Sequence, residues 1–367
     1  MTTLAFIALL AWIYLATLHG RFWQGGPLLL KATPASLPEI AIVVPARDEA
    51  DCIADSIGSL LAQNYAGPLQ VVLVDDNSTD GTADVARKLP GSERLRIITG
   101  QPRPDGWAGK LWAVHQGVSQ TDAELVLLTD ADIVHDPAHL SSIVAKLLTT
   151  RADMVSEMVQ LRCEGLFERM LIPAFVYFFQ LLYPFAWVNN TQRATAAAAG
   201  GSVLIRRRAL DRIGGIASMS SALIDDVTLA SRVKLGGRIW LGHSTLARSI
   251  RRYPEPRDIW NMIARSAYTQ LKLSPALLVL STLGMGLLFV VPPVAAANGI
   301  SMGGFAWTIM AATFWPTLQR MKQSPFWVPF LPTIAIFYMA ATIGSAWNHH
   351  FGRGVVWKDR AYSEPQT

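Results

Sequence analysis

A run of apolar residues that ends in two carboxylates constrains the fold of this chain more than any other feature. Residues 125–128 are all apolar and are followed by Thr129-Asp130-Ala131-Asp132. Such a run predicts a strand buried on both faces, as in the centre of a parallel sheet. If the backbone stays extended, Asp130 and Asp132 share a face and can both approach one cation. The alternative is a strand followed by an ordinary Asx-type turn.

Further strand patterns, each largely apolar, occupy residues 40–44, 69–74 and 95–98, and helical patterns lie between them. Strands that alternate with helices over about 100 residues predict an α/β fold with a doubly wound, mainly parallel sheet. In such a sheet the ligand binds beyond the carboxyl ends of the strands. Those ends carry charged clusters at Arg47-Asp48-Glu49, at Asp75-Asp76 and at Asp130-Ala131-Asp132. A binding site is therefore expected there.

Other classes of binding site do not fit the sequence. No G-x-G-x-x-G pattern follows a strand, which argues against a dinucleotide oxidoreductase. The run Gly106-Trp107-Ala108-Gly109-Lys110-Leu111 is not a P-loop, because it lacks the first glycine and Leu111 replaces the hydroxyl residue that binds magnesium. Lys and Arg do not form a block with interleaved aromatic residues, so a nucleic-acid partner is not expected.

The composition predicts that part of the chain lies in lipid, since 51% of residues are hydrophobic and only 16% are charged. Residues 1–22 are interpreted as an N-terminal transmembrane anchor, with a cleaved signal peptide as the alternative. Arg21 and Lys31 place its C-terminal side in the cytoplasm. The net charge of +5 suits anionic lipid or an anionic substrate. Cys52 and Cys163 are expected to be free thiols in a reducing compartment.

Residues 273–348 are again apolar and are expected to form C-terminal transmembrane helices. Candidate spans lie near residues 275–297, 303–319 and 326–347. Basic residues in the tail (residues 349–367) favour a cytoplasmic C-terminus. Three spans would instead place the tail outside, so either one candidate is re-entrant or the charge rule fails here. The basic residues concerned are Arg353, Lys358 and Arg360.

Three motifs in order resemble the signature of the family 2 glycosyltransferases, which have the GT-A fold. They are Val43-Val44-Pro45-Ala46-Arg47-Asp48-Glu49, Val74-Asp75-Asp76-Asn77-Ser78-Thr79-Asp80-Gly81-Thr82 and Thr129-Asp130-Ala131-Asp132. The resemblance covers residues 38 to 270 and implies a donor-binding half (38–150) and an acceptor half (151–272). Within that family, Pro104-Asp105-Gly106-Trp107-Ala108-Gly109-Lys110 and Val356-Trp357-Lys358-Asp359-Arg360 resemble the hopene-associated glycosyltransferases of bacterial hopanoid clusters.

The resemblance implies roles for the residues at the strand ends. Asp132, with Asp130, would hold Mg²⁺ or Mn²⁺ against the diphosphate of a nucleotide sugar, where the metal offsets charge on the leaving group. Asp130 is also expected to face the donor sugar. Asp76 would contact the base or ribose, and Lys110 would reach the base or the diphosphate. Lys110 could equally be a solvated residue at a helix start. The nucleotide pocket would be lined by Pro45, Ala46, Arg47 and Glu49, whereas turn or cap roles are expected for Asp48 and Asp80.

The family places its catalytic base in an acidic pair after the metal motif. Asp225-Asp226 occupies that place in this chain, with Asp in the position of the usual Glu. Asp226 would take the proton of the acceptor hydroxyl, and the charge of Asp225 would raise the pKa of the pair. The alternative is a pair of residues that cap a helix beside Val227 and Leu229.

A further family motif, Gln/Arg-x-x-Arg-Trp, is altered here to Met262-Ile263-Ala264-Arg265-Ser266. Arg265 is expected to keep the role of diphosphate clamp. The missing Trp argues against a processive synthase, which would stack its growing glycan on that ring. A transferase of single sugars is therefore expected.

Residues 171–188 are nearly long enough to cross a bilayer, but a span there would put Asp226 and Asp132 on opposite sides. Two prolines and Gln180 suit an interfacial helix over residues 166–188 that brings a lipid acceptor to the site. A buried core helix is the alternative.

Together these features predict a multi-pass protein of the inner (cytoplasmic) membrane whose catalytic domain faces the cytoplasm. The expected activity is metal-dependent, inverting transfer of one sugar from a nucleotide sugar to a lipid, which the resemblance suggests is hopanoid-related. Polyprenyl phosphate or a ceramide-type lipid is the alternative acceptor. A non-catalytic membrane scaffold that retains the fold is the alternative of another class.

Overall fold

The computed structural model describes residues 1–351, 356, 357, 360 and 361. The chain divides into two compact units. We call Pro27–Leu161, Trp187–Arg251 and Trp357–Thr367 the sheet unit, and Met1–Gly26, Arg162–Ala186 and Arg252–Val356 the helical unit. The predictions for the side chains of Arg353, Lys358 and Arg360, and the resemblance at residues 356–360, fall outside the described side chains.

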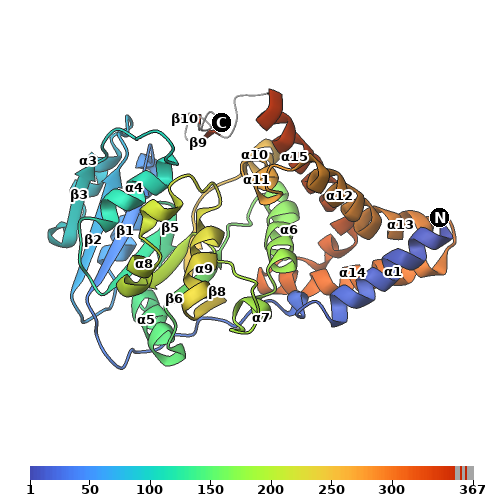
Figure 1. The fold of residues 1–367 in the computed structure, drawn as a ribbon, viewed down its shortest axis with the longest axis horizontal. Coiled ribbons are helices and arrows are strands. Elements are labelled where there is room, and N and C mark those ends of the chain that lie inside the picture. Colours follow the sequence, from blue (N-terminus) through green and yellow to red (C-terminus); the bar gives the residue numbers. More distant parts are fainter. Residues whose placement is uncertain (352–355, 358–359, 362–367) are drawn as a thin grey trace. The chain divides into compact units, whose positions relative to one another are not determined.

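The first half of the sheet unit is the parallel, doubly wound arrangement that the sequence predicts (Figure 1). The strands lie in the order β3-β2-β1-β4, and each pair of neighbours is parallel. The predicted apolar runs form β1 (Ile40–Ala46), β2 (Leu69–Asp75), β3 (Leu95–Thr99) and β4 (Leu125–Thr129). The helices between them are α2 (Ala50–Leu61), α3 (Thr82–Arg87), η2 (Ser92–Arg94) and α4 (Gly109–Val118).

The second half of the sheet mixes strand directions and continues the order as β7-β6-β8-β5. β7 is antiparallel to β4 and to β6, β8 is parallel to β6, and β5 is antiparallel to β8. The strands are β5 (Ile133–His135), β6 (Met154–Gln160), β7 (Ser202–Arg206) and β8 (Ile239–Ser249). The helices of this half are α5 (His139–Thr150), α8 (Arg207–Arg212), η3 (Ile216–Met219) and α9 (Asp225–Gly236).

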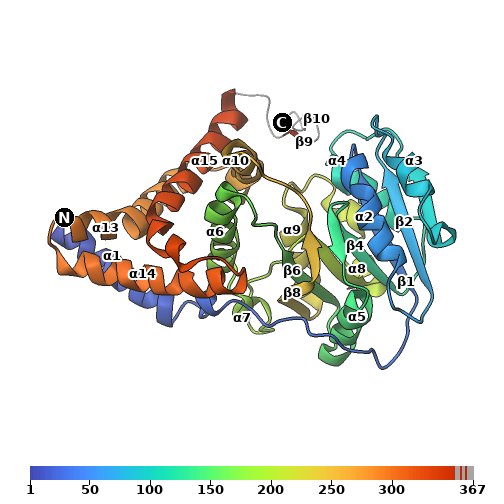
Figure 2. The ribbon, with the colours of Figure 1, turned by 180° about the vertical axis from the view of Figure 1, so that it is seen from behind.

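Alternation along β1 explains how helices cover both faces of the sheet. Ile40, Ile42 and Val44 point to one face, where they join a buried cluster with residues of α2 and α5. Figure 2 shows these two helices on one side of the sheet. Val43 points to the other face, toward α4. A Cβ added to Gly117 of α4 would lie 2.5 Å from Val43 Cγ1, so glycine at this position lets α4 approach the sheet closely.

The helical unit contains the predicted N-terminal helix, the central apolar run and the C-terminal helices. Its elements are α1 (Thr2–Thr17), η1 (Phe22–Gln24), α6 (Leu166–Leu182), α10 (Pro256–Ala264), α11 (Ala267–Gln270), α12 (Pro275–Met285), η4 (Gly286–Val290), α13 (Val291–Ala297), α14 (Ser301–Arg320), η5 (Pro325–Phe330) and α15 (Leu331–Phe351). The short helix α7 (Phe185–Val188) crosses the boundary between the units, and the short strands β9 (Val356–Trp357) and β10 (Arg360–Ala361) follow α15.

The central run is two helices rather than one, because the helix that contains Pro173 ends before Pro184. α6 packs within the helical unit, where the hydroxyl groups of Tyr177 and Thr313 lie 2.8 Å apart and the Tyr338 hydroxyl donates to the carbonyl of Leu171. This packing favours the buried-helix alternative. An interfacial position stays a prediction.

Two segments of the described residues are long and apolar enough to cross a membrane, Pro275–Ala297 and Pro325–Phe351. The predicted candidate near residues 303–319 forms α14 but is not apolar enough to qualify, and α1 is apolar but short. By length and composition, two of the predicted C-terminal candidates therefore remain. This is weak evidence for membrane association.

Candidate functional site

The ends of β1 and β2 bring several of the predicted nucleotide-binding residues together. Pro45 and Ala46 are the last residues of β1, and the Asp76 N–H donates to the carbonyl of Ala46 at 2.8 Å. Arg47 Nη1 donates to the Asp76 carbonyl at 2.7 Å and lies 3.7 Å from its carboxylate. A Cβ added to Gly100 would lie 3.1 Å from Asp76 Cα, so the chain after β3 passes close to this residue.

Asp48 and Asp80 have the local structural roles that the sequence predicts. Asp48 Oδ1 accepts a hydrogen bond from the Thr79 N–H at 2.7 Å and so joins the loops after β1 and β2. Asp80 Oδ2 accepts from the N–H of Ala50, the first residue of α2, at 2.9 Å. These carboxylates stabilise the loops that carry the nucleotide-binding candidates.

The chain turns directly after β4, so the expectation of an extended Asp130-Ala131-Asp132 backbone is wrong. The Ile133 N–H donates to the Asp130 carbonyl at 3.3 Å, which closes a turn before β5. As a result the two carboxylates contact different cations in this structure. Asp130 Oδ1 lies 2.8 Å from Lys110 Nζ, and Asp132 Oδ2 accepts a hydrogen bond from Arg251 Nε at 2.6 Å.

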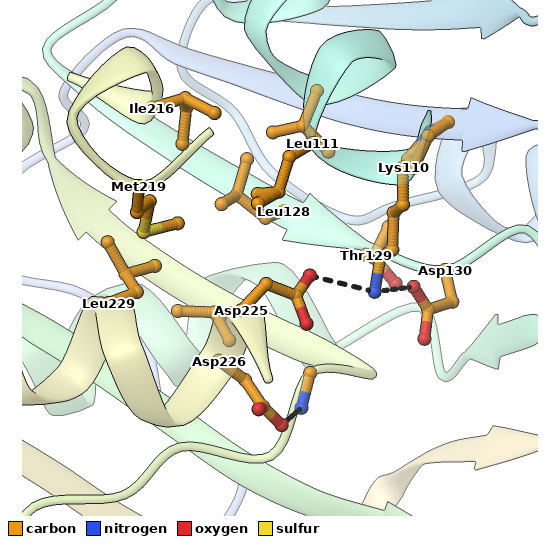
Figure 3. Close-up of a pocket in the computed structure, with 14 residues that line it drawn as sticks. Lys110, Leu111, Leu128, Thr129, Asp130, Ile216, Met219, Asp225, Asp226 and Leu229 are labelled. Atoms are coloured by element: carbon orange, nitrogen blue, oxygen red, sulfur yellow. Dashed lines mark hydrogen bonds and ion pairs between the residues drawn. The ribbon is translucent and has the colours of Figure 1, made fainter. Parts of the chain in front are cut away.

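Lys110, the second residue of α4, links the metal motif to the acidic pair Asp225-Asp226 (Figure 3). Its Nζ lies 2.8 Å from Asp130 and 3.4 Å from Asp225 Oδ2. Burial alone would lower the pKa of Lys110, but the negative charges of Asp130 and Asp225 outweigh burial and raise it above its ordinary value. Lys110 is therefore a fixed positive charge between these carboxylates. It does lie at a helix start, as the alternative predicts, and its contact with a donor stays a prediction.

Asp226 is fixed by two backbone N–H groups. Oδ2 accepts from the Gly200 N–H at 3.0 Å (Figure 3). Oδ1 accepts from the Val227 N–H at 2.8 Å. Both members of the acidic pair lie in the first turn of α9, just after its N-cap residue Ile224, so neither is the N-cap that the alternative predicted. That position does not exclude a role as base. Burial, and then the charge of Asp225, raises the pKa of Asp226 to about 7.

A small apolar cavity next to the acidic pair explains the desolvation of Asp226. Its volume of ≈ 30 Å³ is enough for about one water molecule. The polar part of the wall is formed by Lys110, Thr129, Asp130, Asp225 and Asp226 (Figure 3). The remaining lining residues are Pro45, Leu111, Val114, Leu128, Gly200, Val203, Ile216, Met219 and Leu229. A carboxylate beside such a wall loses hydration and binds its proton more tightly.

Arg251 and its pairing with Glu49 were not predicted from the sequence. Arg251 Nη2 lies 3.0 Å from Glu49 Oε1, while its Nε binds Asp132. Arg251 is 119 residues from Asp132 in the sequence, and its one local signal is its place just beyond the end of β8.

Cys52 donates to Glu49 Oε2 at 3.2 Å, and burial together with that carboxylate raises the pKa of the thiol to about 12. Both cysteines are free, as predicted.

Arg265 lies in the helical unit, where its N–H donates to the carbonyl of Asn261 at the end of α10. Its assignment as a diphosphate clamp stays a prediction.

The carboxylates of Asp130 and Asp132 suit a hard divalent cation. No group of three or more His, Cys, Asp or Glu residues in the described part of the chain could hold a metal by itself. Mg²⁺ is usually held by one or two carboxylates together with substrate phosphates and water, rather than by a complete protein cage. The residues present therefore fit a metal site that a diphosphate completes.

Sequence comparison supports the resemblance over the middle of the chain. Residues 41–214 match the model of glycosyl transferase family 2. The chain is 30% identical over 142 residues to a dodecaprenyl-phosphate galacturonate synthase of Rhizobium johnstonii, which is 38% of this chain and 41% of that protein. It is 28% identical over 100 residues to a 4,4'-diaponeurosporenoate glycosyltransferase of Staphylococcus haemolyticus, 27% of this chain and 26% of that protein. The matches thus span less than half the length of these curated relatives.

Comparison with solved structures supports the fold over most of the chain. A mannosyltransferase from Pyrobaculum calidifontis, solved in complex with GDP-Man and Mn²⁺, aligns with a TM-score of 0.58 at 18% sequence identity. The alignment covers 95% of this chain and 99% of the mannosyltransferase. This chain therefore has the GT-A fold, and its residues 41–214 match the glycosyl transferase family 2 model.

Proposed function

We propose that this protein is a metal-dependent, inverting glycosyltransferase that moves one sugar from a nucleotide sugar to a lipid acceptor. One observation carries the proposal. Lys110 contacts both Asp130 at the end of β4 and Asp225 at the start of α9, so the donor motif and the acidic pair form one charged cluster. A donor at the strand ends would then lie beside a carboxylate, Asp226, whose pKa suits proton transfer near neutral pH.

Each residue of the cluster has a role in this proposal. Asp226 accepts the proton of the acceptor hydroxyl as that oxygen attacks the sugar carbon opposite the departing nucleotide. Asp76 holds the base or ribose, in a pocket with Pro45, Ala46, Arg47 and Glu49. Asp132 and Asp130 would hold Mg²⁺ or Mn²⁺, and the bound ion would offset negative charge on the diphosphate leaving group.

The lipid acceptor and the membrane location are supported less directly. The names of the two relatives include a dodecaprenyl phosphate and a diaponeurosporenoate, both long isoprenoid groups. Two apolar segments could anchor the chain in the inner membrane as a multi-pass protein with the sheet unit in the cytoplasm. We propose a hopanoid-related acceptor from the run at residues 104–110 and keep polyprenyl phosphate as the second candidate, which the name of the first relative favours. A ceramide-type lipid completes the set of candidate acceptors.

The experiment uses the full chain, purified in detergent, with a panel of UDP, GDP and dTDP sugars. Hopanoid, polyprenyl-phosphate and ceramide acceptors are supplied separately, and glycolipid is detected by mass spectrometry. We expect one donor and one acceptor class to give product, EDTA to abolish product formation, and added Mn²⁺ or Mg²⁺ to restore it. Failure to bind any nucleoside diphosphate would contradict the transferase and favour the scaffold alternative.

The pH dependence of the reaction is expected to follow Asp226. A base acts only when deprotonated, and the pKa of Asp226 is about 7. We expect kcat/KM to rise about tenfold per pH unit below that value and to level off above it. Because the charge of Asp225 contributes to the raised pKa, Asp225→Asn should move the profile to lower pH. A profile that does not move in this variant would show that Asp226 does not control the acidic limb.

A further inference from the structure

We propose that Arg251 is a diphosphate-binding residue that neutralises the metal-site carboxylates until the donor arrives. The proposal rests on the proposed function, since it assigns the metal to Asp132. It predicts that a divalent ion alone binds poorly to this protein, and that a diphosphate makes the ion bind well by drawing Arg251 away from Asp132.

The geometry around Arg251 is that of a cation bound between two enclosed carboxylates. Its Nε donates to Asp132 Oδ2 at 2.6 Å and its Nη2 lies 3.0 Å from Glu49 Oε1. The side chains of Asp132 and Glu49 are 11% and 13% exposed, whereas that of Arg251 is 40% exposed. The two carboxylates are thus enclosed by protein, and the guanidinium covers them from the solvent side.

The backbone keeps Arg251 beside the metal motif. The N–H of Ile250, the preceding residue, donates to the carbonyl of Asp132 at 2.9 Å. The Arg251 N–H itself donates to the Ser249 hydroxyl at 3.3 Å. Movement of the guanidinium therefore requires only a change of side-chain rotamer, because the backbone stays anchored at the turn after β4.

Charge explains why Arg251 and a metal compete. A poorly hydrated carboxylate is costly without a nearby positive charge, and Arg251 supplies that charge to Asp132. A divalent ion at Asp132 would supply it instead and would repel the guanidinium at contact distance. Lys110 stays with Asp130 and Asp225, so the exchange concerns Asp132 and Glu49.

A diphosphate favours the exchange because it offers the guanidinium a new partner. Arg forms two parallel hydrogen bonds to phosphate oxygens. These bonds replace the hydrogen bond that Arg251 loses at Asp132. The ion and the diphosphate then bind cooperatively, and linkage requires each to raise the affinity of the other by the same factor. This gives Arg251 a role distinct from that of a permanent structural ion pair.

The test measures binding of Mn²⁺ to the full chain in detergent by electron paramagnetic resonance, with and without inorganic pyrophosphate. Arg251→Gln should bind Mn²⁺ alone about fivefold or more tightly than the wild type, and pyrophosphate should increase its Mn²⁺ affinity much less. Arg251→Lys keeps the charge but not the planar fork, so Mn²⁺ alone should bind as in the wild type while the effect of pyrophosphate falls. The matched control is Arg248→Gln, an exposed arginine on β8, which should behave as the wild type.

The outcomes separate this proposal from the proposed function. If Arg251→Gln binds Mn²⁺ alone no more tightly than the wild type, Arg251 is a structural ion pair and the proposal is overturned while metal-dependent transfer stands. If the wild type binds no Mn²⁺ even with pyrophosphate, both fail. Thermal melting checks that each variant is folded, and Arg251→Lys decides the question should Arg251→Gln fail to fold.

Discussion

Replacing Asp226 with Asn is expected to abolish sugar transfer while leaving donor binding nearly unchanged. The Asn side chain has the same size and retains an oxygen that can accept from the Gly200 N–H, but it cannot take a proton. Loss of a positioned general base costs about 10²–10⁴-fold in rate. The measurement is kcat for glycolipid formation together with the Kd of the nucleoside diphosphate that the donor panel identifies.

The matched control for this variant is Asp225→Asn at the neighbouring position. Asp225 pairs with Lys110 rather than with a backbone N–H of the Gly200 loop, so its loss should leave measurable transfer. If Asp226→Asn instead loses donor binding as well as catalytic rate, Asp226 belongs to the donor site and the base lies elsewhere. Equal losses in the two variants would point to a shared electrostatic role.

Stability provides a second check on Asp226→Asn. The pKa of Asp226 is raised in the folded state above the ordinary value of 3.8, so the native protein favours the protonated form. The stability that this proton provides is complete below pH 3.8 and is lost as the pH rises through about 7. Asn cannot ionise, so the variant should melt at a higher temperature than the wild type at pH 8. A variant that is more stable and yet inactive has lost chemistry rather than structure.

The donor half of the fold could be predicted from the sequence because its central strands contain unbroken apolar runs, at residues 40–44, 71–74 and 125–128. β1, β2 and β4 are buried on both faces, and each ends in a charged cluster that marks the edge where a ligand binds. The order of these clusters also gave the resemblance to the family 2 glycosyltransferases, and the model of that family matches residues 41–214. The register of the sheet then brings Ala46 beside Asp75 and so joins the loops that follow these two strands.

The second half of the sheet was not predicted because polar residues interrupt its strands. β6 contains Ser156 and Glu157, and β8 contains His243 and Ser244, yet all of these side chains are buried. A pattern that relies on apolar runs cannot distinguish such strands from loops. The partner of Asp132 was missed for another reason, because a salt bridge between residues 119 positions apart leaves no local pattern.

The turn after β4 shows a limit of reasoning from strand geometry. The expectation that Asp130 and Asp132 share a face assumed that the strand continues. Instead, the Ile133 N–H donates to the Asp130 carbonyl and closes a turn. The pairing of each carboxylate with its own cation, Lys110 or Arg251, follows from that turn. The sequence predicted which residues are present at this edge but not how they are paired.

Replacing Glu157 with Gln is expected to lower the free energy of unfolding by about 3–5 kcal/mol, because removing one partner breaks a fully buried carboxylate–histidine pair. Glu157 and His139 are both 0% exposed, and Glu157 Oε1 contacts His139 Nε2. Burial alone would raise the pKa of Glu157, but His139 and hydrogen bonds from Ser244 and Ser202 outweigh burial and lower it. Glu157 is therefore ionised in the folded protein, deep in the sheet.

The measurement is urea unfolding of the full chain in detergent, with Glu124→Gln as the matched control. Glu124 is 60% exposed and pairs with Arg206 at 3.4 Å, so its loss should cost less than about 1 kcal/mol. The double variant Glu157→Gln/His139→Gln removes both members of the pair and should recover part of the lost stability. Equal costs for Glu157→Gln and Glu124→Gln would show that the buried pair contributes no more to stability than the exposed one. Ser202 lies two residues beyond Gly200, whose N–H holds Asp226. Any transfer activity that Glu157→Gln loses while still folded would therefore show that this buried pair helps to position the base.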